Sequence, residues 1–129
     1  MEFRFYNIDN YILNNLSEYS LEYNDILNKI LKDKNSNLDD LLEKRDCIEE
    51  NILEILNNQK YIGYLSEDEY YDIESEFRKK YFGNNILDIQ QINNMYNEIK
   101  IHDSELYEKL KYILEKSIKD SKNIYILVK

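Results

Sequence analysis

The sequence lacks proline, alanine, threonine and tryptophan, and it has only two glycines, one cysteine and one histidine in 129 residues. Without proline, no helix or strand loses a backbone donor, so long uninterrupted elements are possible. The single cysteine, Cys47, excludes an internal disulfide and fits a reducing compartment. We therefore expect a cytoplasmic protein.

Long apolar runs are also absent. The first ten residues, MEFRFYNIDN, contain no basic start followed by an apolar stretch, and no segment approaches the ~18 apolar residues of a membrane span. We expect neither a signal peptide nor membrane insertion. Hydrophobic residues form 43% of the chain and charged residues 33%, which is typical of a folded protein. The length predicts one domain over residues 1–129, with an arm at 1–8 and an apolar tail at 123–129.

Positive charge is scarce. Seventeen basic residues against 26 acidic ones give a net charge of −9, which repels phosphate backbones and excludes ordinary nucleic-acid binding. Residues 98–129 hold seven lysines and six acids, so the net charge of residues 1–97 is −10. The acidic surface is therefore expected in the N-terminal and central parts of the chain.

Apolar residues recur at alternating spacings of three and four, the period of amphipathic helices. The pattern predicts helices over residues 9–32, 38–60, 67–81 and 86–122. Because only about five residues connect the first two, these should form an antiparallel hairpin. The predicted fold is all-α, an antiparallel four-helix bundle built from helical hairpins.

Local signals mark the helix ends. Gly63 is the natural break after the second helix, and Ser66 with Glu69 predicts a capping box for the third. Gly83 should close the third helix, after Lys79 and Lys80 in its last turns. Asp103 occupies a seam position of the fourth pattern. It is either a polar layer in a continuous helix, which we favour, or the cap of a new segment that starts at Ser104.

Arg45 is the one charge in the predicted seam of the second helix. The hairpin register places it opposite Tyr23 and near the carboxylates of Glu22 and Asp25. We expect Tyr23 and Arg45 to have a structural role, through a cation–π contact or an ion pair.

No motif predicts catalysis, a cofactor or a metal site. The acids around Glu67–Glu76 lack the turning glycine of a calcium loop, and the dipole of a helix favours acids in its first turn. His102 and Asp103 have no second histidine to complete a metal site, and neighbouring helical positions point in different directions. We therefore interpret the protein as a non-enzyme with solvated acidic faces.

Two stretches resemble the FliT/FlgN-type flagellar export chaperones. The first is LDDLLEKRDCI at residues 38–48, and the second is the pattern I-x-x-x-D-x-x-L-x-x-x-L from Ile99 through Asp103 to Leu110. The resemblance covers roughly residues 10–122. It implies a small cytoplasmic helical chaperone that binds the C-terminal helical segment of an export substrate and prevents premature assembly.

Two other interpretations remain open. The charge of residues 1–97, and a composition typical of AT-rich genomes, suit a small acidic phage or viral inhibitor or immunity protein that blocks a basic effector surface. A structural or oligomerising bundle without a transient client is the third.

Apolar side chains beyond the predicted seam indicate where a protein partner would bind. On the fourth helix and the tail, these could offer a groove to a partner helix. The candidate binding residues are Tyr107, Tyr112, Leu114, Tyr125 and Leu127. Ordinary packing explains any one of them equally well, so only their joint exposure would indicate a binding groove.

Overall fold

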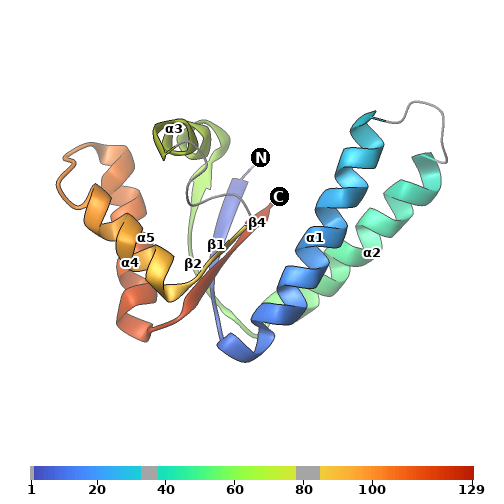
Figure 1. Cartoon of the computed structure of the whole chain (residues 1–129), viewed down its shortest axis with the longest axis horizontal. Coiled ribbons are helices and arrows are strands. Elements are labelled where there is room, and N and C mark those ends of the chain that lie inside the picture. Colours follow the sequence, from blue (N-terminus) through green and yellow to red (C-terminus); the bar gives the residue numbers. More distant parts are fainter. Residues whose placement is uncertain (1, 33–37, 78–84) are drawn as a thin grey trace. The chain divides into compact units, whose positions relative to one another are not determined.

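The computed structural model describes residues 2–32, 38–77 and 85–129, and within these ranges it contains helices and a four-stranded antiparallel sheet (Figure 1). The elements in chain order are β1 (Glu2–Ile8), α1 (Asn10–Lys32), α2 (Leu38–Leu56), β2 (Lys60–Ser66), α3 (Glu67–Phe77), β3 (Ile86–Leu87), α4 (Ile89–Ile99), α5 (Glu105–Asp120) and β4 (Asn123–Val128). The prediction of an all-α four-helix bundle is therefore wrong, because the fold is mixed α/β.

The strands come mainly from segments that the bundle prediction left without a helix. The predicted arm at 1–8 contains β1 and the predicted tail at 123–129 contains β4, and these two pair as the central strands of the order β2-β1-β4-β3. In β1, Phe3 and Phe5 are buried while Arg4 and Tyr6 are half-buried. This alternation has the period of two that a strand requires.

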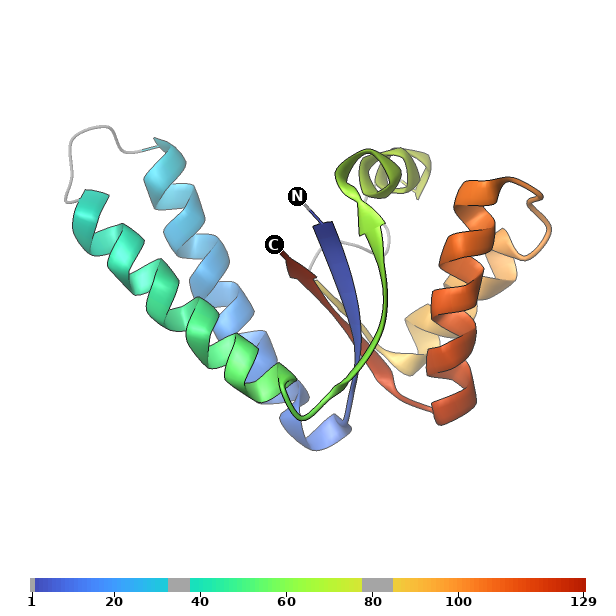
Figure 2. The ribbon, with the colours of Figure 1, turned by 180° about the vertical axis from the view of Figure 1, so that it is seen from behind.

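Three helices cover one face of the sheet. Figures 1 and 2 show α3, α4 and α5 on the same side of the strands. Their buried side chains form one core with the strand residues that point toward them. This core includes Phe5 of β1, Leu65 of β2, Ile73 of α3, Met95 of α4, Leu110 of α5 and Ile126 of β4.

Gly63 permits the closest approach between α5 and the sheet. The register between β1 and β2 shifts next to it, so Ile62 is an extra residue that forms a bulge. Gly63 has φ +147°, and a Cβ atom added there would lie 2.7 Å from Cγ1 of Ile113. The glycine predicted as a helix break thus lies inside a strand, where both its backbone angle and its missing side chain are needed.

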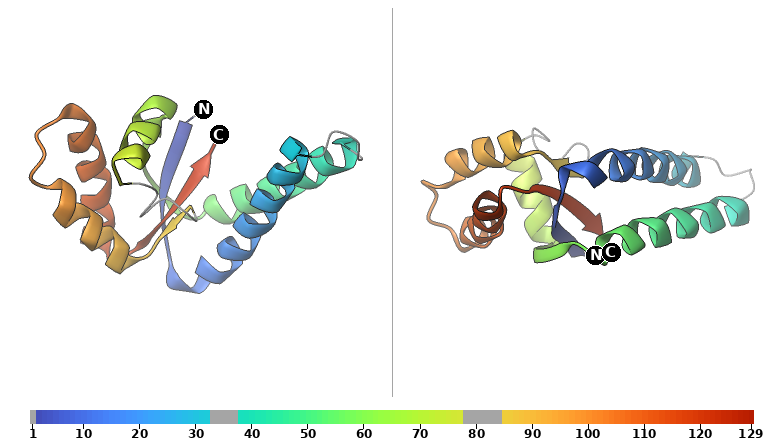
Figure 3. Two further views of the ribbon diagram at one scale, coloured as in Figure 1. Left: turned by 45° about the horizontal axis from the view of Figure 1, so that its top comes forward. Right: turned by 90° about the horizontal axis from the view of Figure 1, so that it is seen from below.

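Residues Tyr11–Asn58 form a second compact unit, separate from the unit made by residues 1–10 and 59–129. It is a hairpin of two antiparallel helices (Figure 3). The predicted helix at 9–32 is confirmed as α1, and the one at 38–60 starts as predicted. However, α2 ends at Leu56, because the chain enters β2 at Lys60. Predicted turn residues 33–37 lie outside the described ranges.

The predicted capping box of α3 is confirmed. The Ser66 backbone NH donates to Glu69 Oε1 at 2.9 Å, and the Glu69 NH donates to Ser66 Oγ at 3.2 Å. This helix is described as far as Phe77, so the predicted end at Lys79, Lys80, Tyr81 and Gly83 lies outside the described residues.

The prediction of one continuous helix over 86–122 is wrong. That segment holds β3, α4 and α5, with a turn at residues 100–104 between the helices. Ser104 is the N-cap of α5, and its side chain accepts a hydrogen bond from the Tyr107 NH. The alternative with a new helical segment near Asp103 is therefore closer to the structure, although the capping residue is Ser104.

Candidate functional site

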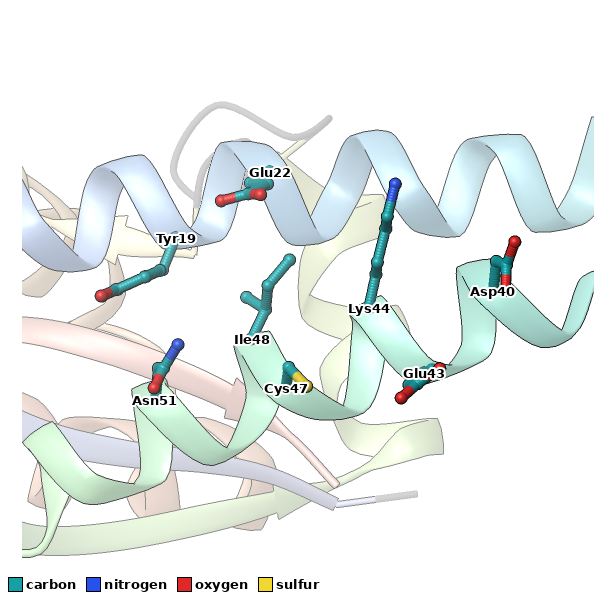
Figure 4. Close-up of a pocket in the computed structure, with 8 residues that line it drawn as sticks. All are labelled: Tyr19, Glu22, Asp40, Glu43, Lys44, Cys47, Ile48 and Asn51. Atoms are coloured by element: carbon teal, nitrogen blue, oxygen red, sulfur yellow. The ribbon is translucent and has the colours of Figure 1, made fainter. Parts of the chain in front are cut away.

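A groove of about 530 Å³ lies along the helical hairpin (Figure 4). Its α2 residues follow one another at i, i+3, i+4, i+7, i+8 and i+11, which is a continuous stripe on one side of a helix. Two residues of α1, spaced by three, form the opposite wall. The lining residues are Tyr19 and Glu22 of α1, and Asp40, Glu43, Lys44, Cys47, Ile48 and Asn51 of α2.

The floor of the groove is apolar. Ile48 is buried, with 6% of its surface exposed, and it points from α2 toward α1 in Figure 4. Tyr19 is half-buried and lies beside Asn51. Since Ile48 is almost fully covered, the half-buried Tyr19 ring adds accessible apolar surface to the floor.

The rim of the groove is acidic. Glu22, Asp40 and Glu43 are exposed carboxylate residues, and Lys44 is the only base among the lining residues. The whole hairpin, Tyr11–Asn58, contains 11 of the 26 acids and five of the 17 bases, so it carries −6 of the net charge of −9. The acidic surface predicted from the sequence is thus concentrated on this unit.

The two predicted seam residues, Tyr23 and Arg45, are both half-buried. Burial raises the pKa of Tyr23, Glu49 raises it further, and the charge of Arg45 lowers it, so the predicted proximity is visible in the electrostatics. Arg45 donates to its neighbour Asp46 at 3.2 Å, and a third of its side chain is exposed. Its energetic role stays a prediction.

The five predicted partner-binding residues do not form one exposed surface. Tyr107 and Leu114 lie on α5 and are buried in the core, and Tyr125 and Leu127 are buried positions of β4. Only Tyr112 is exposed, at 61%, and the Lys116 ammonium lies 4.2 Å above its ring. The structure does not bring these residues together as a groove.

Glu69 and His102 have structural contacts. Burial alone would raise the pKa of Glu69, but hydrogen bonds from Ser66 and from Lys109 outweigh it and hold this pKa below its usual value. His102 stacks on Tyr107, with ring centroids 4.7 Å apart. Within the described ranges, no group of three or more His, Cys, Asp or Glu residues is placed to hold a metal ion.

The sequence contained a signal for the hairpin groove that went unused. The predicted register pairs residues whose numbers sum to about 68. Tyr19 with Ile48 and Glu22 with Lys44 have sums of 67 and 66, close to that value, and all four line the groove. The predicted pairs were seam residues, among them Tyr23 with Arg45, and these do not include the acidic rim.

No described helix combines the length and apolar character needed to cross a membrane. Comparison with known proteins found no matching family model, no matching curated protein and no matching solved structure.

Proposed function

We propose that this chain is a non-catalytic protein that binds a basic segment of another protein along its acidic helical hairpin. The observation that supports the proposal best is topological. In the order of the chain, the hairpin connects β1 to β2, and these two strands pair directly as antiparallel neighbours. Such strands need a connection of only about two residues. The 48 residues of Tyr11–Asn58 therefore do more than connect them.

The charge of the hairpin supports a basic partner. A net charge of −6 on a unit of this size opposes its own packing through self-repulsion. A positively charged partner offsets that repulsion, and complementary charge also speeds association. A basic effector protein blocked by an acidic inhibitor fits this description. The free thiol of Cys47 fits an interaction in the cytoplasm.

One observation favours a second candidate, the chaperone function implied by the flagellar export resemblance. The LDDLLEKRDCI stretch lies in α2 and supplies five of the groove residues. In that case the partner is a helical segment of an export substrate. The second stretch of the resemblance departs from the pattern, because Ile99 and Leu110 belong to different helices.

The test is a pull-down from the source organism followed by binding of the purified partner. A variant with Glu22→Gln, Asp40→Asn, Glu43→Gln, Glu18→Gln, Asp25→Asn and Glu50→Gln brings the net charge of the hairpin from −6 to zero. The control, Asp68→Asn, Asp72→Asn and Glu105→Gln, neutralises exposed acids of α3 and α5. We expect only the hairpin variant to lose the partner.

The identity of the partner separates the two candidates. A basic nuclease or toxin supports the inhibitor, and a flagellar filament or cap protein supports the chaperone. A purified partner that binds the hairpin variant as tightly as the unmodified chain would exclude the hairpin as the binding unit.

A further inference from the structure

We infer that the occupant of the hairpin groove is an amphipathic α-helix of the partner, with an apolar side chain over Ile48 and basic side chains facing the acidic rim. This inference rests on the proposed function and specifies the form of the partner. A disordered basic tail and a flat basic surface are the main alternatives.

The shape of the groove supports a helix. Its α2 wall is a stripe from Asp40 to Asn51, which spans about 17 Å at the helical rise of 1.5 Å per residue. A stripe at spacings of three and four is the surface against which another helix packs. An extended chain, whose side chains alternate with a period of two, does not match that spacing.

The apolar floor supports an amphipathic occupant over a purely basic one. Ile48 is nearly covered while the neighbouring rim residues Lys44, Cys47 and Asn51 are exposed. At the same end of the groove, Tyr19 contributes a half-buried ring. A leucine or similar side chain would pack against the accessible part of the Tyr19 ring beside Ile48, whereas a disordered lysine-rich tail would leave that ring exposed.

The order of charges along α2 indicates an orientation. Asp40 and Glu43 lie toward the start of α2, and the neutral residues Cys47, Ile48 and Asn51 follow. The partner helix should therefore have its basic end near the start of α2. Cations are favoured at the C-terminal end of a helix, so we expect the partner to run antiparallel to α2.

Charge also argues against a second copy of this chain in the groove. Two hairpins with a net charge of −6 each would repel one another. Lys44 is the single base of the lining and should weaken the binding of a basic helix. Removing its charge should therefore strengthen that binding.

The experiment uses the full chain and two synthetic peptides of equal composition. One peptide is an 18-residue helix with leucines on one stripe and lysines flanking it, concentrated toward its C-terminal end. The other has the same residues in an order without helical periodicity. We expect the amphipathic peptide to bind at least about tenfold more tightly, measured by isothermal titration calorimetry.

Two matched variants locate the binding surface. The groove variant is Glu22→Gln, Asp40→Asn and Glu43→Gln. The control variant, Glu18→Gln, Asp25→Asn and Glu50→Gln, removes the same residue types from exposed hairpin positions that do not line the groove. Each exposed ion pair is worth about 1.4- to 5-fold in affinity, so the groove variant should bind the amphipathic peptide about tenfold more weakly. The control variant should differ by less than about threefold.

Lys44→Gln should increase the affinity for the peptide, which is an effect that damage to the fold cannot produce. This variant should bind the amphipathic peptide about two- to fivefold more tightly than the unmodified chain. Circular dichroism verifies that every variant remains folded.

Cys47 gives a positional test, because it is the only cysteine of the chain and lies in the middle of the groove. A peptide whose one central cysteine carries a pyridyl disulfide should exchange with the Cys47 thiol, forming a mixed disulfide and releasing pyridinethione, faster than with the thiol of a Cys47→Ser, Glu50→Cys variant. Equal rates would contradict this placement of the peptide.

The outcomes are distinguishable. If both triple variants weaken binding equally and the two peptides bind alike, the helix inference is overturned while an acidic binding hairpin stands. In another outcome, neither peptide binds, and the purified partner binds the six-substitution hairpin variant as tightly as the unmodified chain. That result would overturn both the helix inference and the proposed function. If the unmodified chain is a dimer that the groove variant dissociates, a second copy occupies the groove and the inference is overturned.

Discussion

Lys111 of α5 donates a 2.6 Å hydrogen bond from its Nζ atom to the backbone carbonyl oxygen of His102, in the turn between α4 and α5. The side chain of Lys111 is almost fully buried and also pairs with Glu108 at 3.1 Å. Buried or half-buried backbone carbonyls at a helix end need such partners. Lys111 thus fixes the turn that replaces the predicted continuous helix.

Lys111→Met should lower the free energy of unfolding by about 1.5–3 kcal/mol, because it removes a hydrogen bond with a charged donor while keeping the apolar stem. Urea unfolding measures this change. Lys119→Met, at an exposed position of the same helix, is the matched control and should stay within about 0.5 kcal/mol. Equal effects of both variants would contradict the role of Lys111 in the turn.

Ser104→Ala should cost about 1 kcal/mol of stability, because the Ser104 side chain caps the NH of Tyr107 at 3.3 Å. Asp103→Ala, one residue earlier, should cost much less. The pair can be compared by thermal unfolding under identical conditions. A larger loss for Asp103→Ala would restore Asp103 as the cap.

Gly63→Ala should destabilise the protein by about 1–3 kcal/mol, since the new Cβ meets Ile113 and the backbone angle is unfavourable for alanine. A double-mutant cycle with Ile113→Ala separates the two causes. If crowding dominates, the double variant is more stable than the sum of the single losses predicts. Strict additivity would assign the whole loss to the backbone angle.

Glu69→Gln should weaken stability at neutral pH by about 0.2–1 kcal/mol, because glutamine keeps the capping acceptor but loses the charge opposite Lys109 at 2.9 Å. The pKa of Glu69 is lowered in the folded protein. Its charge therefore contributes fully above the unfolded value of ~4.3, and this contribution is lost as pH falls through the folded value. Urea midpoints from pH 7 to pH 3 should converge for the two proteins, while Asp72→Asn serves as an exposed control.

Arg45→Met should change the free energy of unfolding by less than about 1 kcal/mol, because a third of its side chain is exposed and its ion pair with Asp46 is exposed too. Chemical denaturation measures this change. A loss near 3 kcal/mol would indicate that Arg45 makes a desolvated pair in the hairpin.

Helix positions that depend only on the spacing of apolar residues and on cap residues could be predicted from the sequence. The start and end of α1, the start of α2 and the capping box of α3 follow from apolar spacing and cap residues. The break between α4 and α5 was hidden because Ile99 and Leu106 are seven residues apart. The five-residue turn between them preserves the helical phase, so the pattern looks continuous across it.

The strands were missed for different physical reasons. In β2, Ile62 and Leu65 are both buried although they are three residues apart, because the bulge at Ile62 shifts the alternation to a helix-like spacing. In β4 both faces are buried, so its run Ile124–Leu127 shows no alternation. For the candidate groove, the hairpin register was available from the sequence, but which side chains form the floor and which the exposed rim depends on burial in the folded hairpin, which spacing alone does not determine.

The pairing of β1 with β4 has a consequence for folding kinetics. Phe5 pairs with Ile126, 121 positions later in the chain, so the centre of the sheet depends on a contact of very high sequence separation. Contacts of this kind form slowly, whereas single helices of about 20 residues form within about a microsecond. We expect the acidic hairpin to acquire its structure first, and the edge of β1 that pairs with β4 to be completed last. Until β4 pairs with it, the unpaired edge of β1 is the part of the chain most prone to aggregate.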